Sequence, residues 1–273
     1  MIVFRTDGNS QIGLGHVMRC MSIADAFVEA GEECLFVLAD VSVEAVVKKR
    51  GFETFVMNTR FDCMETEFDK MQSVNMRFRP RYIVVDSYFV TEEYFRFLGT
   101  LGRVVYLDDL AAFAYPVDVL VNYNVYAADM DYAAIYKRGD VCLPRCILGV
   151  EYAPLRKEFR DIPACMPREN VQDIFVSTGG ADTVHLALRL VRFLTGQPEC
   201  AKELKFHILL GEMNVDRDEI MELASGIDNI MVHRMVQEMK SWMRMCDIAV
   251  SAAGSTLYEL CACGVPTITY VVA

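Results

Sequence analysis

The sequence predicts an α/β fold made of two domains, each with a parallel β-sheet. Along most of its 273 residues, apolar runs of strand length alternate with segments whose apolar residues recur at helical spacing. This alternation is typical of parallel sheets that helices cover on both faces. A proline-containing segment, residues 151–172, interrupts the alternation, so we expect domains at residues 1–150 and 173–273.

The first domain is expected to begin with a strand, a glycine-containing loop and a helix. Apolar residues at three- and four-residue spacing from Val17 to Val28 indicate this helix, and Gly31 ends it. A helix capped by Thr91 is expected at residues 91–98. The other expected strands are 35–39, 53–56, 82–85, 104–107 and 117–121, and the other expected helices are 43–50 and 62–79.

The second domain shows the same alternation. Its expected strands are 173–177, 206–210, 230–233, 248–251 and 268–272, and its expected helices are 183–194, 216–225, a segment through 242–245, and 257–263. In both domains polar clusters follow the strands directly. Ligands bind beyond the carboxyl ends of the strands in such sheets, so these clusters are the candidate site residues.

Composition narrows the class of protein. Hydrophobic residues make up 53% of the chain, which is ample for sizeable cores, and no apolar run approaches the length of a membrane span. No signal peptide is evident, and the ten cysteines lack zinc-site spacing, so we expect reduced thiols in a cytoplasmic protein without a metal. The net charge of −11 argues against nucleic acid, and an anionic ligand would need helix ends, glycine loops and a few arginines.

The segment Ile12-Gly13-Leu14-Gly15-His16 carries the first candidate chemistry. Glycines let a backbone approach a ligand closely, and a helix N-terminus presents unpaired N–H groups that suit a phosphate. His16 is the group here that can lose and regain a proton near neutral pH. From spacing alone, a tight strand-to-helix turn with an incidental histidine is an equally good interpretation.

With Arg5, Asp7 and Arg19 around it, this segment resembles the nucleotide-sugar hydrolase family of the pseudaminic acid pathway. Other motifs follow in the family's order, namely Val84-Val85-Asp86-Ser87-Tyr88, Leu107-Asp108-Asp109, Asn122-Tyr123-Asn124, Tyr152-Ala153-Pro154-Leu155-Arg156, Gly179-Gly180-Ala181-Asp182, and Gly254-Ser255-Thr256 with Glu259. They cover nearly the whole chain, and the first and last motifs are the specific ones.

The resemblance implies a GT-B-like fold, in which two Rossmann-type domains face each other across a cleft. Relatives continue past the last expected strand, so the second domain is expected to be incomplete at its C-terminus. The implied activity is metal-independent, inverting hydrolysis of a UDP-linked 2,4-diacetamido-2,4,6-trideoxyhexose, with His16 as the general base and no cofactor. The rival hypotheses are a GT-B glycosyltransferase of surface or spore-coat polysaccharide synthesis, and a protein that only binds a nucleotide-sugar.

In the first domain the resemblance places Tyr88 near the sugar, although packing in the core is an alternative for an aromatic residue after a strand. Asp7 is expected to orient His16, to bind the sugar, or to form a turn. Arg19 would bind phosphate or pair with a carboxylate such as that of Asp86. Further candidates for substrate binding are Gly13, Gly15, Asn122, Asn124, Tyr152 and Arg156. Asn122 and Asn124 alternate with Tyr123, so both would point to the same side, toward a ligand with acetamido groups, or they would cap turns instead.

Asp108 and Asp109 form a carboxylate pair at a strand end, where a metal or acid–base site is one interpretation. Adjacent residues in an extended chain face opposite ways, which favours a turn or helix-cap role instead. His185, His207 and His233 are isolated histidines in helix or strand patterns and are expected to be structural.

In the second domain we expect UDP at two glycine-containing loops, each before a helix. Gly179, Gly180 and Asp182 belong to the first loop, which suits a diphosphate. Gly254, Ser255 and Thr256 belong to the second, where the hydroxyls would donate to phosphate or simply cap the helix. Glu259 would hold the ribose hydroxyls or complete a capping box.

Overall fold

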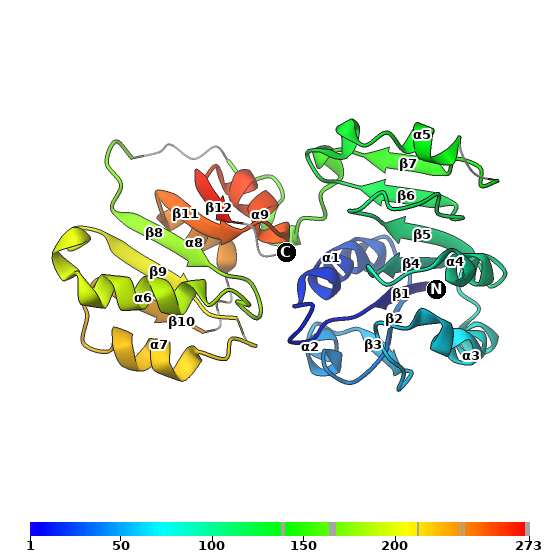
Figure 1. Cartoon of the computed structure of the whole chain (residues 1–273), viewed down its shortest axis with the longest axis horizontal. Helices are drawn as coiled ribbons and strands as arrows, with labels where there is room; N and C mark the ends of the chain where they lie inside the picture. Colours follow the sequence, from blue (N-terminus) through cyan, green and yellow to red (C-terminus); the bar gives the residue numbers. More distant parts are fainter. Residues whose placement is uncertain (138–139, 164–167, 212, 235, 237, 271–273) are drawn as a thin grey trace. The chain divides into compact units, whose positions relative to one another are not determined.

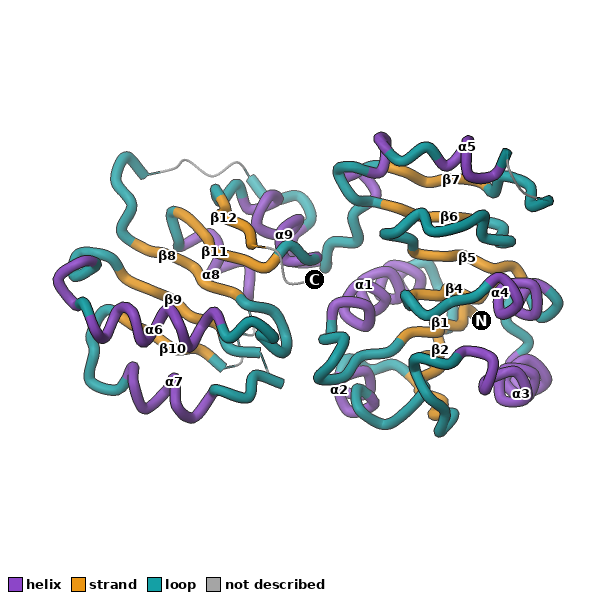
Figure 2. The backbone as a smooth tube through the Cα atoms, viewed as in Figure 1, coloured by secondary structure: helices purple, strands orange, loops and turns teal. Residues whose placement is uncertain are grey.

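The structure, a computed structural model, describes residues 1–137, 140–163, 168–211, 213–234, 236 and 238–270. The chain divides into two compact units, one comprising Met1–Asn9 and His16–Pro154 and the other Ser10–Gly15 and Leu155–Ala273 (Figure 1). Each unit contains its own parallel sheet, drawn in orange in Figure 2. Among the described residues, none of the helices combines the length and apolar character that a membrane crossing requires.

The first unit is built on a seven-stranded sheet of order β3-β2-β1-β4-β5-β6-β7. Its strands are β1 Ile2–Thr6, β2 Cys34–Leu38, β3 Glu53–Val56, β4 Tyr82–Asp86, β5 Arg103–Leu107, β6 Val119–Asn122 and β7 Arg145–Leu148. Its helices are α1 Gly15–Glu29, α2 Glu44–Lys49, α3 Phe68–Phe78, α4 Glu92–Gly99 and α5 Tyr132–Tyr136, with short 3-10 turns η1 Met64–Glu67, η2 Ala127–Asp129 and η3 Val150–Tyr152.

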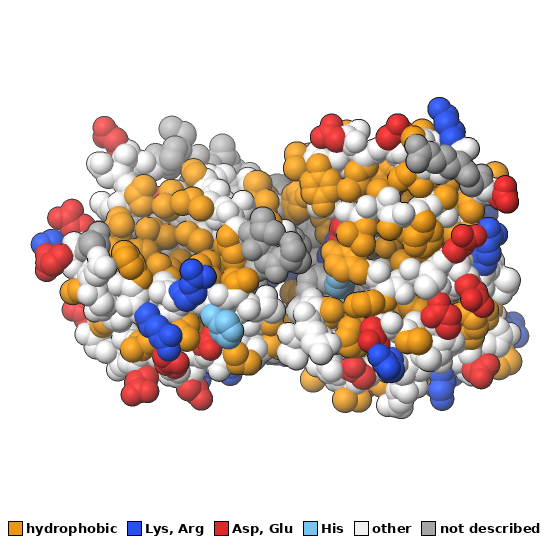
Figure 3. Space-filling model, viewed as in Figure 1, with side chains coloured by type: hydrophobic (Ala, Val, Ile, Leu, Met, Phe, Trp, Pro, Cys, Tyr) orange, Lys and Arg blue, Asp and Glu red, His pale blue; other side chains and the backbone are white. Residues whose placement is uncertain are grey.

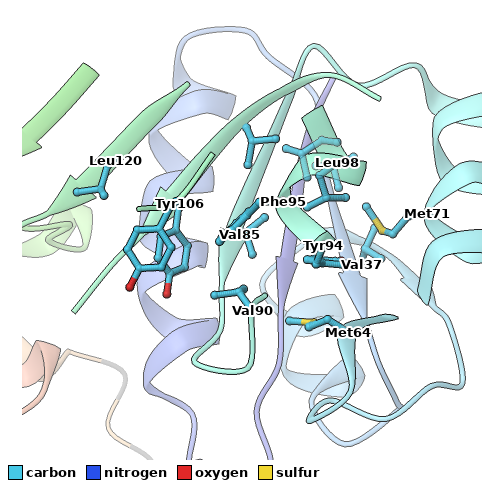
Figure 4. Close-up of a cluster of buried hydrophobic side chains, with 14 of the residues drawn as sticks. Val37, Met64, Met71, Val85, Val90, Tyr94, Phe95, Leu98, Tyr106 and Leu120 are labelled. Carbon is cyan, nitrogen blue, oxygen red and sulfur yellow. The ribbon is translucent and has the colours of Figure 1, made fainter. Parts of the chain in front are cut away.

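The core of this unit lies where α3 and α4 cover one face of the sheet. Figure 4 shows side chains of the strands, such as Val85 and Tyr106, packed with Phe95 and Leu98 of α4. The hydroxyl of Thr91 accepts from the backbone N–H of Tyr94 at 3.2 Å, so the predicted cap of α4 is confirmed. The central strands are buried on both faces, as parallel strands between helix layers must be.

The second unit is built on a five-stranded sheet of order β10-β9-β8-β11-β12. Its strands are β8 Asp173–Ser177, β9 Lys205–Leu209, β10 Ile230–His233, β11 Ile248–Ala252 and β12 Thr267–Tyr270. Its helices are α6 Leu186–Gly196, α7 Arg217–Ala224, α8 Met239–Met245 and α9 Ser255–Cys263. Two short 3-10 turns are η4 Lys157–Phe159 and η5 Pro198–Cys200. Separate hydrophobic clusters involve α6 with α7 and α8 with α9, which fits a sheet covered on both faces.

The expected α/β class and the parallel sheets are confirmed in both units. Sequence patterns missed β7, a four-residue strand at the edge of the sheet whose side chains are all at least partly exposed. Such a strand lacks the continuous apolar run that marks a buried one. On the face shown in Figure 3, acidic and basic side chains are scattered rather than gathered into a basic patch.

Candidate functional site

The candidate site in the first unit begins with His16, the second residue of α1. Gly13, with φ of +71°, makes the turn that leads from β1 toward the helix. Strand β1 pairs with β4 so that Thr6 lies beside Asp86, which brings this carboxylate to the start of α1. The Nδ1 atom of His16 lies 2.6 Å from Oδ1 of Asp86, and His16 is only 8% exposed.

The Asp86 carboxylate is buried and heavily bonded. Arg19 donates to it twice, from Nε to Oδ2 and from Nη2 to Oδ1, both at 2.6 Å. Burial by itself would raise the pKa of Asp86, but Arg19 and His16 outweigh burial and hold that pKa well below its usual range. Asp86 is therefore ionised and accepts from His16, so Nδ1 is the donor in this hydrogen bond, and Nε2 is the ring nitrogen that carries the lone pair in the neutral tautomer.

Tyr88 borders His16. Its ring meets the imidazole edge-on at a centroid distance of 4.6 Å, and its side chain is half exposed. The Tyr88 hydroxyl donates to Oδ2 of Asp109 at 2.9 Å. Burial, followed by the nearby Asp109 carboxylate, raises the pKa of Tyr88, so the phenol stays neutral at ordinary pH.

The two adjacent carboxylates after β5 face different surroundings, as expected. Asp108 is buried and accepts from the backbone N–H groups of Leu110 and Ala111, which confirms its turn role. Asp109 is different, because Oδ2 accepts from Arg19 Nη1 at 2.9 Å as well as from Tyr88. Sequence reasoning considered Asp108 and Asp109 together as a possible site but favoured a turn or helix-cap role for both, so it did not include Asp109 among the site residues. Its position beyond β5, the strand next to β4, was the available signal.

The side chains of Asn122 and Asn124 do lie on the same side, but they are hydrogen-bonded to each other. Asn124 donates from Nδ2 to Oδ1 of Asn122 at 3.0 Å, and Asn122 donates to the Tyr132 hydroxyl at 2.9 Å. Asn122 is fully buried, so the expectation that it contacts a ligand is corrected. Asn124 is partly exposed and also donates to Oδ1 of Asp109 at 2.8 Å, which connects it to the site.

Asp7 also has a different partner from the one expected. Its carboxylate accepts from Arg5 Nη1 at 2.5 Å and from the backbone N–H of Ala39 at 2.8 Å. Arg5 is itself buried and paired with Glu67. The group that orients His16 is therefore Asp86 rather than Asp7.

In the second unit, the loop after β8 places Gly179 at φ of +80°. The nearby Gly211 has to be glycine, because a Cβ there would lie 2.4 Å from the carbonyl oxygen of Gly179. Asp182 is buried, and its two carboxylate oxygens accept from the backbone N–H groups of Leu186 and Ala187, both at 2.9 Å. These two N–H groups at the start of α6 are thus occupied by Asp182, which caps the helix. Diphosphate binding by the Gly179-Gly180 loop itself stays a prediction.

The start of α9 is arranged differently. Gly254 is the N-cap residue, and among the described residues no side chain caps this helix. Ser255 and Thr256 are partly exposed. The simple capping interpretation of their hydroxyls is therefore wrong. In the first turn the N–H of Leu257 donates to the carbonyl oxygen of Gly254 at 3.0 Å, so Ser255 and Thr256 carry the N–H groups that a helix start ordinarily leaves without an intrahelical partner.

Glu259 follows in α9 and is 8% exposed. Arg156 donates to its two oxygens from Nε at 2.6 Å and from Nη2 at 2.8 Å, a bidentate pair. The capping-box interpretation of Glu259 is wrong, because the carboxylate pairs with Arg156 instead. Tyr152, in η3, is 52% exposed. In the described part of the chain, no group of three or more His, Cys, Asp or Glu side chains is placed to hold a metal.

Comparisons with known sequences agree with the predicted resemblance. Residues 172–272 match the glycosyltransferase family 28 C-terminal domain. The chain is 23% identical to the UDP-2,4-diacetamido-2,4,6-trideoxy-beta-L-altropyranose hydrolase of Campylobacter jejuni, over 85% of this chain and 84% of that protein. It is 20% identical to the uncharacterized protein MJ1062 of Methanocaldococcus jannaschii, over 98% of this chain but only 54% of that protein. The chain therefore spans about half the length of the archaeal relative.

Comparisons with solved structures confirm the GT-B-like fold. The MurG protein of Acinetobacter baumannii aligns with a TM-score of 0.54 at 13% identity, over 98% of this chain and 85% of that one. A putative UDP-N-acetylglucosamine 2-epimerase of Listeria monocytogenes aligns with a TM-score of 0.59 at 8% identity, over 98% and 78%. At these identities the similarities show the fold alone.

Proposed function

We propose that the protein hydrolyses a nucleotide-sugar, a UDP-linked 2,4-diacetamido-2,4,6-trideoxyhexose, and releases UDP and the free sugar for synthesis of a pseudaminic-type acid. The observation that carries this proposal is the buried pair of His16 and Asp86, with Nδ1 held at 2.6 Å from the carboxylate. The similarity to the Campylobacter jejuni hydrolase supports the substrate class.

In the proposed reaction, Nε2 of His16 takes a proton from water while the water oxygen attacks the anomeric carbon. The bond from that carbon to the UDP oxygen breaks, and its electron pair leaves with UDP. Attack from the face opposite UDP inverts the anomeric configuration. Asp86 stabilises the imidazolium that forms, and general-base catalysis of this kind contributes about 10²–10⁴-fold.

We place the UDP at the N-terminus of α9. Backbone N–H groups of its first turn and the hydroxyls of Ser255 and Thr256 would donate to the diphosphate, aided by the helix dipole. A carboxylate offers about four lone-pair positions, so Glu259 can accept from ribose hydroxyls while Arg156 holds it. This proposal needs no metal, since the chain itself supplies the positive dipoles.

A second candidate is glycosyl transfer, which the match of residues 172–272 to the family 28 C-terminal domain favours. In that reaction Nε2 of His16 would take the proton of an acceptor hydroxyl instead of water. Incubation with UDP-sugar and no acceptor separates the two reactions. Rapid release of free sugar and UDP supports hydrolysis, and turnover that begins only when an alcohol is added supports transfer.

The test of the base is UDP release from a panel of UDP-amino sugars by the wild type and by His16→Asn. We expect a loss of about 10²–10⁴-fold in kcat for this variant. His185→Asn is a matched control, because His185 also pairs with an aspartate but is exposed and belongs to the second unit. A His16→Asn rate within a few-fold of the wild type would overturn the assignment of His16.

A further inference from the structure

The Asp109 carboxylate determines the direction of a neighbouring hydroxyl. Its Oδ2 accepts hydrogen bonds from Arg19 Nη1 and from the Tyr88 hydroxyl, both at 2.9 Å. Its Oδ1 accepts from Asn124 Nδ2 at 2.8 Å. An arginine guanidinium and an amide nitrogen can only donate, so both oxygens of Asp109 act as acceptors. The Tyr88 hydroxyl must therefore donate its single proton to Asp109.

We propose that Asp109 is a positioning residue that keeps the Tyr88 proton turned away from the ligand, so that Tyr88 offers only acceptor lone pairs to it. The ligand group that binds Tyr88 is then a hydrogen-bond donor, either an N–H or an O–H. This inference rests on the proposed function, in which the donor is an amide N–H or a hydroxyl of the sugar.

The location of Tyr88 fits this role. Its side chain is half exposed, and its ring lies edge-on to His16 at 4.6 Å. A sugar group bound to the Tyr88 oxygen would thus lie close to the proposed base. Since the phenol proton is already committed to Asp109, Tyr88 is a binding residue and does not protonate the UDP oxygen as it leaves.

Arg19 fixes both parts of this arrangement. Its guanidinium donates to Asp86, which orients His16, and to Asp109, which orients Tyr88. Arg19 is 7% exposed and also donates to the Tyr123 hydroxyl at 3.0 Å, so its position is closely determined. One buried cation therefore sets the geometry of the base and of the sugar-binding hydroxyl together.

The kinetic test uses Tyr88→Phe, Asp109→Asn and the double variant. An asparagine can donate to the Tyr88 oxygen, which would turn the phenol proton outward and remove the acceptor. We expect each single variant to raise KM by about 3- to 10-fold, the effect of one ordinary hydrogen bond, with a smaller change in kcat. The double variant should be no worse than the worse single variant, because both remove the same interaction.

Tyr82→Phe is the matched control, since Tyr82 lies at the opposite end of β4. It should leave KM and kcat unchanged. An unchanged KM in Asp109→Asn, or effects that add fully in the double variant, would overturn the proposal. Rescue of KM by Asp109→Glu would support it, because glutamate restores an acceptor for the phenol proton.

A spectroscopic test does not depend on turnover. The protein is labelled with 3-fluorotyrosine, and the ¹⁹F resonance that disappears in Tyr88→Phe is assigned to Tyr88. The chemical shift of this resonance is then followed as a function of pH. Removing the Asp109 charge should lower the pKa of this phenol, and the Tyr82 resonance should not move. An unmoved Tyr88 titration overturns the positioning role. A moved titration without release of UDP from any sugar supports that role and overturns the proposed function.

Discussion

The starts of two helices, α1 and α9, use their polar groups in opposite ways. At α1, His16 and Arg19 are buried and hydrogen-bonded to carboxylates at the carboxyl ends of β4 and β5. At α9, Ser255 and Thr256 are partly exposed, and among the described residues no side chain caps the helix.

This difference separates two chemical tasks. The charge of Arg19 is already shared between Asp86 and Asp109, so it is a poor partner for a phosphate. The start of α9 instead offers hydroxyls and backbone N–H groups to an anion, although the chain carries a net charge of −11. Under the proposed function, proton transfer and sugar binding belong to the start of α1, and anion binding belongs to the start of α9.

The largest expected effect belongs to Asp86. Asp86→Asn would replace the acceptor for Nδ1 of His16 by a neutral amide and remove the main charge partner of Arg19. We expect kcat for UDP release to fall by about 10²–10⁴-fold, because the wrong tautomer or orientation of a base costs this much. Asp118→Asn, at an exposed position just before β6, can still accept from the backbone N–H of Val104 and should retain activity. Equal losses in both variants would contradict the assignment.

The same carboxylate should make stability depend on pH. The folded-state pKa of Asp86 lies below the unfolded value of about 3.9, so its contribution is complete above the unfolded pKa and is lost as pH falls toward the folded one. Urea unfolding of the wild type should therefore show a falling free energy from about pH 5 downward. Asp86→Asn should show a shallower fall, and an identical slope in the two proteins would contradict this account.

At α9, a combined Ser255→Ala and Thr256→Ala variant should weaken UDP binding by about 10-fold, since about two ordinary hydrogen bonds are lost. Stability should change little, because neither hydroxyl caps the helix. Isothermal titration calorimetry with UDP measures the first effect and urea unfolding the second. Unchanged UDP affinity in this variant would contradict the proposal that the start of α9 binds the anion.

The smallest effect concerns α6, a third helix start. Asp182→Ala removes the carboxylate that accepts from the N–H groups of Leu186 and Ala187, which should cost about 0.5–2 kcal/mol in the free energy of unfolding. UDP affinity should stay within about twofold, in contrast to the α9 variant. Urea unfolding and calorimetry on this variant test both parts. A large loss of UDP affinity would show that α6 takes part in anion binding.

Local features of both units were readable from the sequence. The alternation of strands and helices, the Thr91 cap of α4 and the position of His16 at the start of α1 depend on residues a few positions apart. Hydrophobic periodicity, helix capping and glycine turns depend on residues within this short range, so they can be recognised in the amino-acid sequence. The edge strand β7 was not predicted, because its partly exposed residues show no such hydrophobic pattern.

The partners of the charged side chains were decided only by the tertiary structure. Asp86 rather than Asp7 orients His16 because β1 and β4 pair with Thr6 beside Asp86. Arg156 reaches Glu259 across 103 positions of the chain. The sequence by itself determined which groups were available at the strand ends. Strand order and register determined which of them meet, since contacts between distant residues depend on the packed sheet and not on neighbouring positions.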